Sequence, residues 1–303
     1  MDKLTGWVLI GEPATAPEVP SMAIAHSTGR ITSADVSIHF RKLGKPGRVP
    51  VLIVHGLSYC SWDWLEPARD LSSDREVVAM DMRGFGDSDW SRGKDYSVPT
   101  MGEDIGRVLD HLGWKKVALV GHSMGGRSTT YMAAKHPERI AGLALVDFTP
   151  ENAPAGSKRV AQAVANVPDK FASIDEAMAY FGQSTRERFE HYLKPVSGGF
   201  IVKRDTHFRD QFRKLIETGE RPKLGVDMWQ LIGEVRCPIL SMRGSKSDMY
   251  APETKEKMRA ANPRLSVVEV DAGHNIAGEN RAGFLRALQP FLDTLEQEAS
   301  RVY

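Results

Sequence analysis

Residues 117–128 read VALVGHSMGGRS and place a serine between two glycines directly after a short apolar run. The first four of these residues are β-prone, which predicts a buried strand, and residues 124–135 can continue as a helix. Ser123 would then stand in a sharp strand-to-helix turn, with Gly121 and Gly125 on either side. Glycine permits the close approach of neighbouring segments that such a turn requires. The motif therefore predicts a serine hydroxyl that projects from the carboxyl end of a sheet; the alternative is an ordinary glycine-rich turn.

The rest of the chain favours the first interpretation, because short apolar runs alternate with helical segments. Expected strands are residues 34–40, at the sheet edge, and then 51–55, 76–81, 117–120, 140–147, 238–243 and 265–271. Expected helices are residues 62–71, 98–112, 124–135, 252–261 and 281–298. This alternation predicts an α/β fold with a mostly parallel, doubly wound sheet and helices on both faces. Ligands of such sheets gather at the carboxyl ends of the strands.

The alternation stops between Asp147 and Cys237, where the chain reads mainly as helices such as 174–181 and 206–217. The segment is rich in Phe and Tyr, which predicts a helical cap that lies over the strand ends rather than a surface decoration. The expected division is an N-terminal arm at 1–20, a core at 21–149 and 227–303, and a cap at 150–226, inserted between two sheet strands.

Composition excludes several classes of protein. The 303 residues include 40 basic and 39 acidic side chains, a formal net charge of +1, which argues against nucleic-acid binding. Cys60 and Cys237 match no metal or redox spacing and are expected to be ordinary buried thiols. The apolar patch at residues 6–11 is short for a signal peptide, and no apolar run could span a bilayer. We therefore expect a cytoplasmic protein with a small-molecule substrate, no membrane partner, no metal and no cofactor; the oligomeric state is not predicted.

Two loops downstream of Ser123 offer the other groups that a nucleophilic serine needs. Such a serine requires a base within hydrogen-bond reach and an acid that orients the base. Asp248 and His274 follow the last two expected strands, so the chain order is serine, aspartate, histidine. Asp147 ends the strand before the insertion and is a second possible acid, but Asp248 fits the role better and Asp147 is expected to be structural. The sequence predicts a catalytic set of Ser123, His274 and Asp248.

Five motifs in this order resemble the α/β-hydrolase fold with a helical cap. They are VLIVHGL (51–57), AMDMRGFGDSD (79–89), VALVGHSMGG (117–126), SD (247–248) and DAGH (271–274). The resemblance covers about residues 31–295 and implies the same triad of serine, aspartate and histidine.

An acyl-transfer transition state also needs two backbone N–H donors for the oxyanion. The residue after the serine, Met124, supplies one, and the resemblance places the other at Leu57. Four further side chains are expected near the substrate pocket: Ser58, Tyr59, Trp62 and Arg127. Arg127 stands where relatives often carry a small residue, so that it either reaches an acidic group or faces solvent.

The residue in the turn narrows the chemistry that the resemblance implies. Relatives with aspartate there are epoxide hydrolases and haloalkane dehalogenases, and Ser123 argues against both. We expect hydrolysis of a small carboxylic ester or lactone. Alternatives are an amide or vinylogous-diketone C–C bond hydrolase with the same triad, perhydrolase activity, or a small-molecule receptor with slow hydrolysis.

Overall fold

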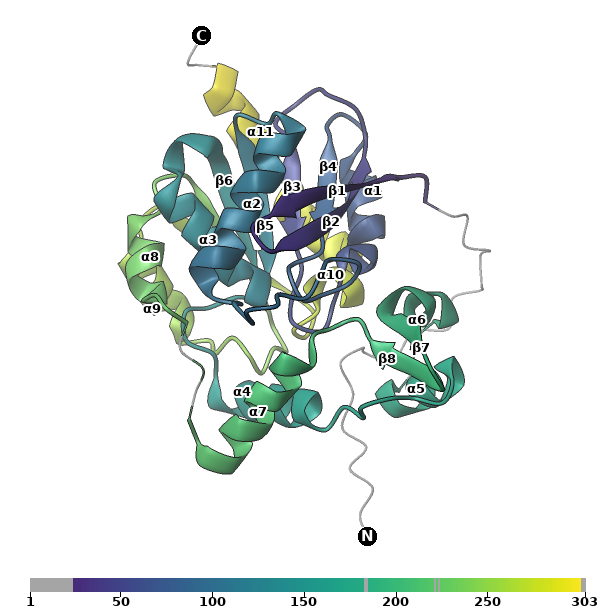
Figure 1. Ribbon diagram of the computed structural model, residues 1–303. Coiled ribbons are helices and arrows are strands. Elements are labelled where there is room, and N and C mark those ends of the chain that lie inside the picture. The colour runs from purple at the N-terminus through teal and green to yellow at the C-terminus, as the bar shows by residue number, and fades with distance from the viewer. Residues whose placement is uncertain (1–23, 183–184, 221, 223, 301–303) are drawn as a thin grey trace.

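The computed structural model describes residues 24–182, 185–220, 222 and 224–300; the expected N-terminal arm at 1–20 lies outside them. A sheet of eight strands runs through the molecule in the order β1-β2-β4-β3-β5-β6-β9-β10 (Figure 1). The pairs β1–β2 and β2–β4 are antiparallel, and every other pair is parallel. This confirms the predicted α/β class with a mostly parallel sheet.

The strands of the sheet are β1 (Ser27–Ser33), β2 (Val36–Leu43), β3 (Val51–Val54), β4 (Val77–Met80), β5 (Val117–His122), β6 (Ile140–Val146), β9 (Ile239–Gly244) and β10 (Leu265–Val270). The helices of the core are η1 (Ser61–Trp64), α1 (Leu65–Leu71), α2 (Val98–Leu112), α3 (Met124–Lys135), η2 (Pro137–Arg139), α8 (Met228–Glu234), α9 (Thr254–Ala261), α10 (Ile276–Glu279) and α11 (Arg281–Ser300). None of the helices in the described residues combines the length and the apolar content that a bilayer crossing requires.

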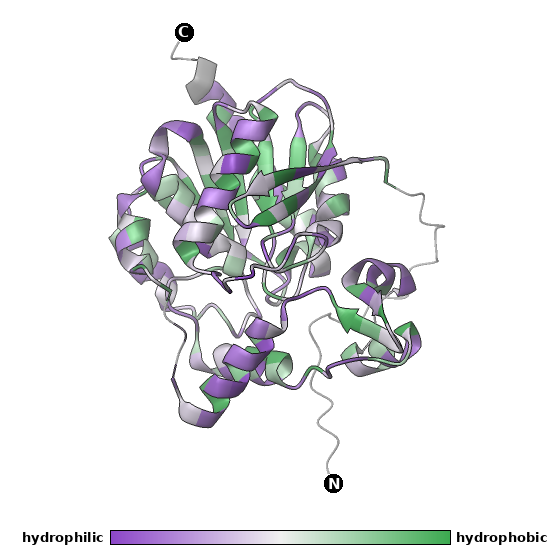
Figure 2. Cartoon of the chain, in the orientation of Figure 1, coloured by the Kyte–Doolittle hydropathy of each residue, from purple (hydrophilic) through white to green (hydrophobic). Residues whose placement is uncertain are grey.

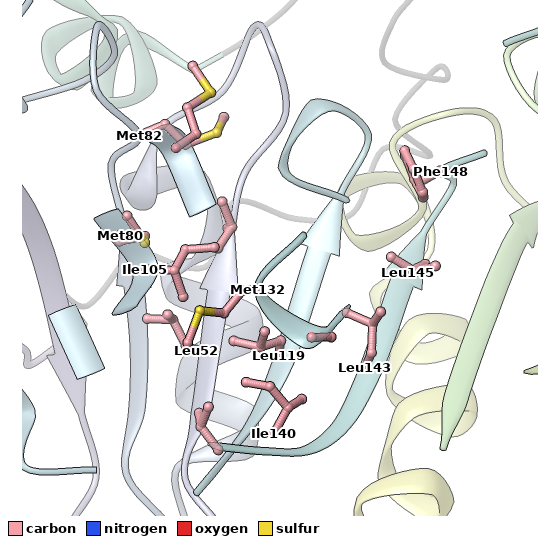
Figure 3. Close-up of a cluster of buried hydrophobic side chains, with 14 of the residues drawn as sticks. Leu52, Met80, Met82, Ile105, Leu119, Met132, Ile140, Leu143, Leu145 and Phe148 are labelled. Atoms are coloured by element: carbon pink, nitrogen blue, oxygen red, sulfur yellow. The ribbon is translucent and has the colours of Figure 1, made fainter. Parts of the chain in front are cut away.

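Alternating side chains of the central strands fill two separate apolar layers. On β3, Leu52 and Val54 join the layer beneath α2 and α3, whereas Val51 and Ile53 join the layer beneath α1 and α11. Figure 2 shows the corresponding pattern, with hydrophobic strands inside and hydrophilic outer helix surfaces. Figure 3 shows part of the first layer, in which side chains of several strands meet Ile105 of α2 and Met132 of α3.

Local signals explain why α2 has the predicted bounds. The Ser97 hydroxyl accepts a hydrogen bond from the N–H of Thr100, which caps the first turn. At the other end Gly113 adopts the left-handed conformation, with φ 68°, that terminates helices.

The expected strand at 34–40 was wrong in its bounds, because the chain forms a hairpin there. Ala34 lies in the turn between β1 and β2 with φ 52°, a conformation that is uncommon for alanine. No glycine or proline marks this turn, so the alternation of side chains alone did not predict it.

Between β6 and β9 the chain forms a cap of helices and one small hairpin, which lies at one end of the sheet (Figure 1). Its elements are α4 (Pro154–Ala165), α5 (Ile174–Phe181), α6 (Arg186–Tyr192), β7 (Leu193–Val196), β8 (Gly199–Val202) and α7 (Thr206–Thr218). The β7–β8 hairpin was not predicted. Most of the aromatic side chains form a core of their own around Phe171 and Phe189 rather than facing the sheet.

Ion pairs attach this cap to loops of the core. Arg188 of α6 donates to Asp63 at 2.6 Å, and Lys203 donates to Asp87 at 2.6 Å. Lys94 in turn donates to Asp205, which precedes α7, at 2.8 Å. The cap is thus held across the loops that follow β3 and β4.

Candidate active site

The turn between β5 and α3 has the strained geometry that the GHSMG motif predicts. Ser123 has φ 50° and ψ −115°, outside the regions that serine ordinarily occupies. A β-carbon at position 125 would lie 2.3 Å from the carbonyl oxygen of Val54, and one at position 121 would lie 2.2 Å from Oγ1 of Thr129. Only glycine fits at these two positions, and the turn presents the serine hydroxyl at the end of the sheet.

His274, in the loop after β10, stands beside this serine. Its Nε2 lies 3.0 Å from Oγ of Ser123, and its Nδ1 lies 2.6 Å from Oδ2 of Asp147. A carboxylate only accepts hydrogen bonds, so Nδ1 carries the proton and the lone pair of Nε2 faces the hydroxyl. The carbonyl oxygen of His274 also contacts Nε2 of His122 at 3.1 Å, which fixes the loop. Two consecutive hydrogen bonds thus join the serine hydroxyl, the imidazole and the carboxylate.

Two further donors hold Asp147 for this contact. Its carboxylate is fully buried, and it accepts from the N–H of Gly244 at 2.9 Å, from Oγ of Ser247 at 2.5 Å and from His274. Its own backbone has φ 44°, a strained value for a residue other than glycine. These hydrogen bonds hold the buried carboxylate in one orientation.

The prediction that Asp248 orients His274 was wrong. Asp248 instead accepts a bidentate pair from Arg159 of α4, with N···O distances of 2.6 and 2.7 Å. This guanidinium lowers the pKa of the Asp248 carboxyl. Asp147 rather than Asp248 contacts the histidine because of the sheet order. β6 lies between β5 and β9, so the end of β6 is nearer to Ser123 than the end of β9 is. Asp147, the second possible acid in the sequence, occupies the position beside the histidine.

The two residues expected to supply the oxyanion donors lie beside the serine. Leu57 and Met124 both line the cavity that contains Ser123 and His274. Met124 is the first residue of α3, so its N–H has no partner within the helix. The N–H of Leu57 makes no backbone hydrogen bond within the described part of the chain.

The cavity at this site has a volume of about 990 Å³ and lies between the core and the cap. Ser58, Tyr59 and Arg127 line it, as predicted. Trp62 does not: its ring stacks on His191 of α6, with centroids 5.2 Å apart, so the prediction for this residue was wrong. Large apolar side chains that sequence reasoning did not single out also line the cavity: Met101, Phe148, Phe208, Phe212, Leu215, Trp229 and Met249. These come mainly from α7, α8 and the loops beside the cap.

Two other groups of reactive side chains carry no comparable geometry. His39, Asp81 and Asp87 are close enough to share an ion, but Arg41 contacts both carboxylates, at 3.7 and 3.2 Å, and Lys203 contacts Asp87 at 2.6 Å. These cations already balance the acidic charge. In addition, burial raises the pKa of the Cys60 thiol, which keeps it protonated.

A serine at a strand-to-helix turn, beside a histidine and a buried aspartate, defines a class of α/β proteins. The chain belongs to the α/β hydrolase fold family, whose model matches residues 49–280, and it is a hydrolase. The 3-hydroxybutyrate-oligomer hydrolase of Cupriavidus necator is 31% identical over 254 residues, 78% of this chain and 86% of that protein. Esterase YbfF of Escherichia coli is 27% identical over 251 residues, 80% of this chain and 93% of that protein.

The fold is also shared with a solved structure. This chain superposes on the crystal structure of E-2-(acetamidomethylene)succinate hydrolase with a TM-score of 0.77 and 24% sequence identity. The match covers 89% of this chain and 100% of the chain in that structure. This likeness supports the fold.

Proposed function

We propose that the protein hydrolyses a small carboxylic ester by acyl transfer through Ser123, His274 and Asp147. The observation that carries the proposal is the continuous line of hydrogen bonds, 3.0 Å from serine to histidine and 2.6 Å from histidine to aspartate. Similarity to a 3-hydroxybutyrate-oligomer hydrolase supports an ester, because hydroxy acids condense through ester bonds.

In the first half of the reaction Oγ of Ser123 attacks the ester carbonyl while its proton passes to Nε2 of His274. The imidazolium that forms is stabilised by the carboxylate of Asp147. The carbonyl oxygen becomes negative, and the backbone N–H groups of Leu57 and Met124, two residues that line the cavity, are the proposed donors to it. Collapse of this intermediate breaks the bond to the alkoxide, which takes the proton from His274 and leaves as an alcohol.

In the second half water attacks the acyl-serine and His274 removes its proton. Collapse then releases the carboxylic acid and returns the proton to Oγ of Ser123. The cavity of about 990 Å³ accommodates a small organic molecule, and its apolar lining favours a substrate with hydrocarbon parts.

The test is steady-state hydrolysis of short-chain p-nitrophenyl esters by the parent protein and by Ser123→Ala. We expect repeated turnover by the parent and a loss of at least roughly 1,000-fold in kcat for the variant. Cys60→Ala, which removes a buried thiol outside the line, should retain the parent rate. Equal turnover by parent and Ser123→Ala would contradict the proposal. A folded parent that leaves every ester intact but cleaves amides or diketones would replace the ester with those substrates.

A further inference from the structure

Arg127 is a cation inside the cavity that the proposed reaction does not use. It lies on α3 four residues after Ser123, so it stands about one turn and roughly 6 Å further along the same side of the helix. Its side chain is partly buried, and it lines the cavity together with Ser123 and His274.

Within the described residues no carboxylate lies within ion-pair distance of Arg127, and its guanidinium makes no hydrogen bond to another side chain or to the backbone. Burial lowers the pKa of this guanidinium, with no acidic neighbour acting in the opposite direction. Two other buried arginines are neutralised: Arg83 donates to Asp104 at 2.6 and 2.7 Å, and Arg188 donates to Asp63 at 2.6 Å. Arg127 therefore differs from these two in facing an open space instead of an acid.

The acidic groups that share the cavity are engaged elsewhere. Asp95 accepts a hydrogen bond from Oγ1 of Thr100 at 2.7 Å, and Glu151 lies 3.6 Å from Lys257. Neither carboxylate is thus a partner of Arg127.

An unpaired, partly buried guanidinium destabilises the fold, because it loses hydration without gaining a partner. Groups that lower stability in this way are typical of binding sites, where the ligand supplies the missing partner. A planar guanidinium matches a carboxylate, which it can bind through two parallel hydrogen bonds.

We propose that Arg127 forms a carboxylate-binding subsite, so that the substrate is a small ester with a free carboxylate a few bonds from the carbonyl that Ser123 attacks. This substrate class rests on the proposed ester hydrolysis. The carboxylate belongs either to the acyl part or to the departing alcohol. The separation of one helical turn between Ser123 and Arg127 is compatible with either position.

Matched substrates separate these cases. Monomethyl succinate carries the carboxylate on the acyl side, and methyl succinamate is its neutral counterpart of the same shape. For the leaving-group side the pair is 3-acetoxybutyrate and 3-acetoxybutyramide. We expect the parent to prefer the acid of at least one pair over its amide.

Arg127→Met removes the charge but keeps the length of the side chain. It should lower kcat/KM for the preferred acid roughly 10- to 100-fold, the range for one charged hydrogen-bond pair. The rate on the matching amide should change less than about threefold, and Arg127→Lys should restore part of the preference. Arg69→Met, which removes an exposed arginine of α1, is the control and should leave both rates unchanged. Equal losses on acid and amide, or a parent without preference, would overturn the subsite.

Binding without turnover keeps the subsite testable if the ester proposal fails. Monomethyl succinate and 3-acetoxybutyrate are titrated calorimetrically into Ser123→Ala and into the double variant Ser123→Ala/Arg127→Met. A tenfold or greater loss of affinity for either acid in the double variant supports the subsite, even if the parent hydrolyses no ester. The same affinity for both acids in the two proteins would overturn it. Folding is checked by Tm, which should not fall in Arg127→Met because no protein contact of the guanidinium is lost.

Discussion

Two aspartates follow neighbouring strands at the same end of the sheet and have different tasks. Asp147 after β6 is fully buried and accepts hydrogen bonds from three donors, one of which is His274. Asp248 after β9 has a side chain that is 37% exposed, and it binds Arg159 of the cap. The comparison shows that a position at a strand end makes an aspartate available, whereas the donors around it decide what it does.

Replacing each aspartate with asparagine separates the two tasks and has the largest expected effect. Asp147→Asn places an amide beside His274. This amide neither holds the proton on Nδ1 nor stabilises the imidazolium. We expect kcat/KM for an ester to fall about 10³- to 10⁴-fold. Asp248→Asn should remain within about threefold of the parent, since it removes a contact of the cap only.

Both measurements use steady-state rates together with a thermal unfolding curve that confirms folding. The reverse ranking, a large loss with Asp248→Asn and a small one with Asp147→Asn, would return the acid to Asp248. Loss of activity in Asp147→Asn together with loss of the cooperative transition would report unfolding rather than catalysis, and stopped-flow acylation of the remaining folded fraction would then decide.

Ser247 connects the two aspartates, because it directly precedes Asp248 in the chain but donates its hydrogen bond to Asp147. Its hydroxyl donates to Oδ2 of Asp147 at 2.5 Å and accepts from the N–H of Met249 at 3.1 Å. Ser247→Ala should lower kcat roughly tenfold, with KM nearly unchanged, because a charge-assisted hydrogen bond is lost. Ser247→Thr keeps the hydroxyl and should recover most of the rate. An alanine variant with parent kcat would show that the other donors suffice to hold Asp147.

The sequence was informative wherever a local pattern determines the structure. Alternation of apolar runs predicted the parallel sheet, and the GHSMG motif predicted the strained turn at Ser123. The β1–β2 turn was missed because Ala34 carries no turn signal, although it adopts a positive φ. For β7–β8 the two glycines at 198 and 199 were a usable signal between two short runs.

The acid could not be assigned from the chain order, because it depends on contacts between distant segments. The approach of Asp147 to His274 requires β6 to lie between β5 and β9 and requires Ser247 to turn inward. The ion pair between Arg159 and Asp248 requires α4, a helix of the inserted cap, to lie beside the loop after β9. Neither arrangement has a periodicity or a spacing in the sequence.

The smallest expected effect tests Asp248 as a link between core and cap. The ion pair with Arg159 is partly exposed, so we expect Asp248→Asn to lower Tm by roughly 1–3 °C at neutral pH. Since Arg159 lowers the pKa of Asp248 in the folded protein, the stabilisation is present above the ordinary carboxyl pKa of 3.8 and is lost as the pH falls through the lower folded value. The Tm difference between parent and variant should therefore shrink in acid, and Arg159→Met should show the same profile. A Tm difference that stays constant from neutral to acidic pH would mean that packing of the side chain, rather than its charge, joins α4 to the core.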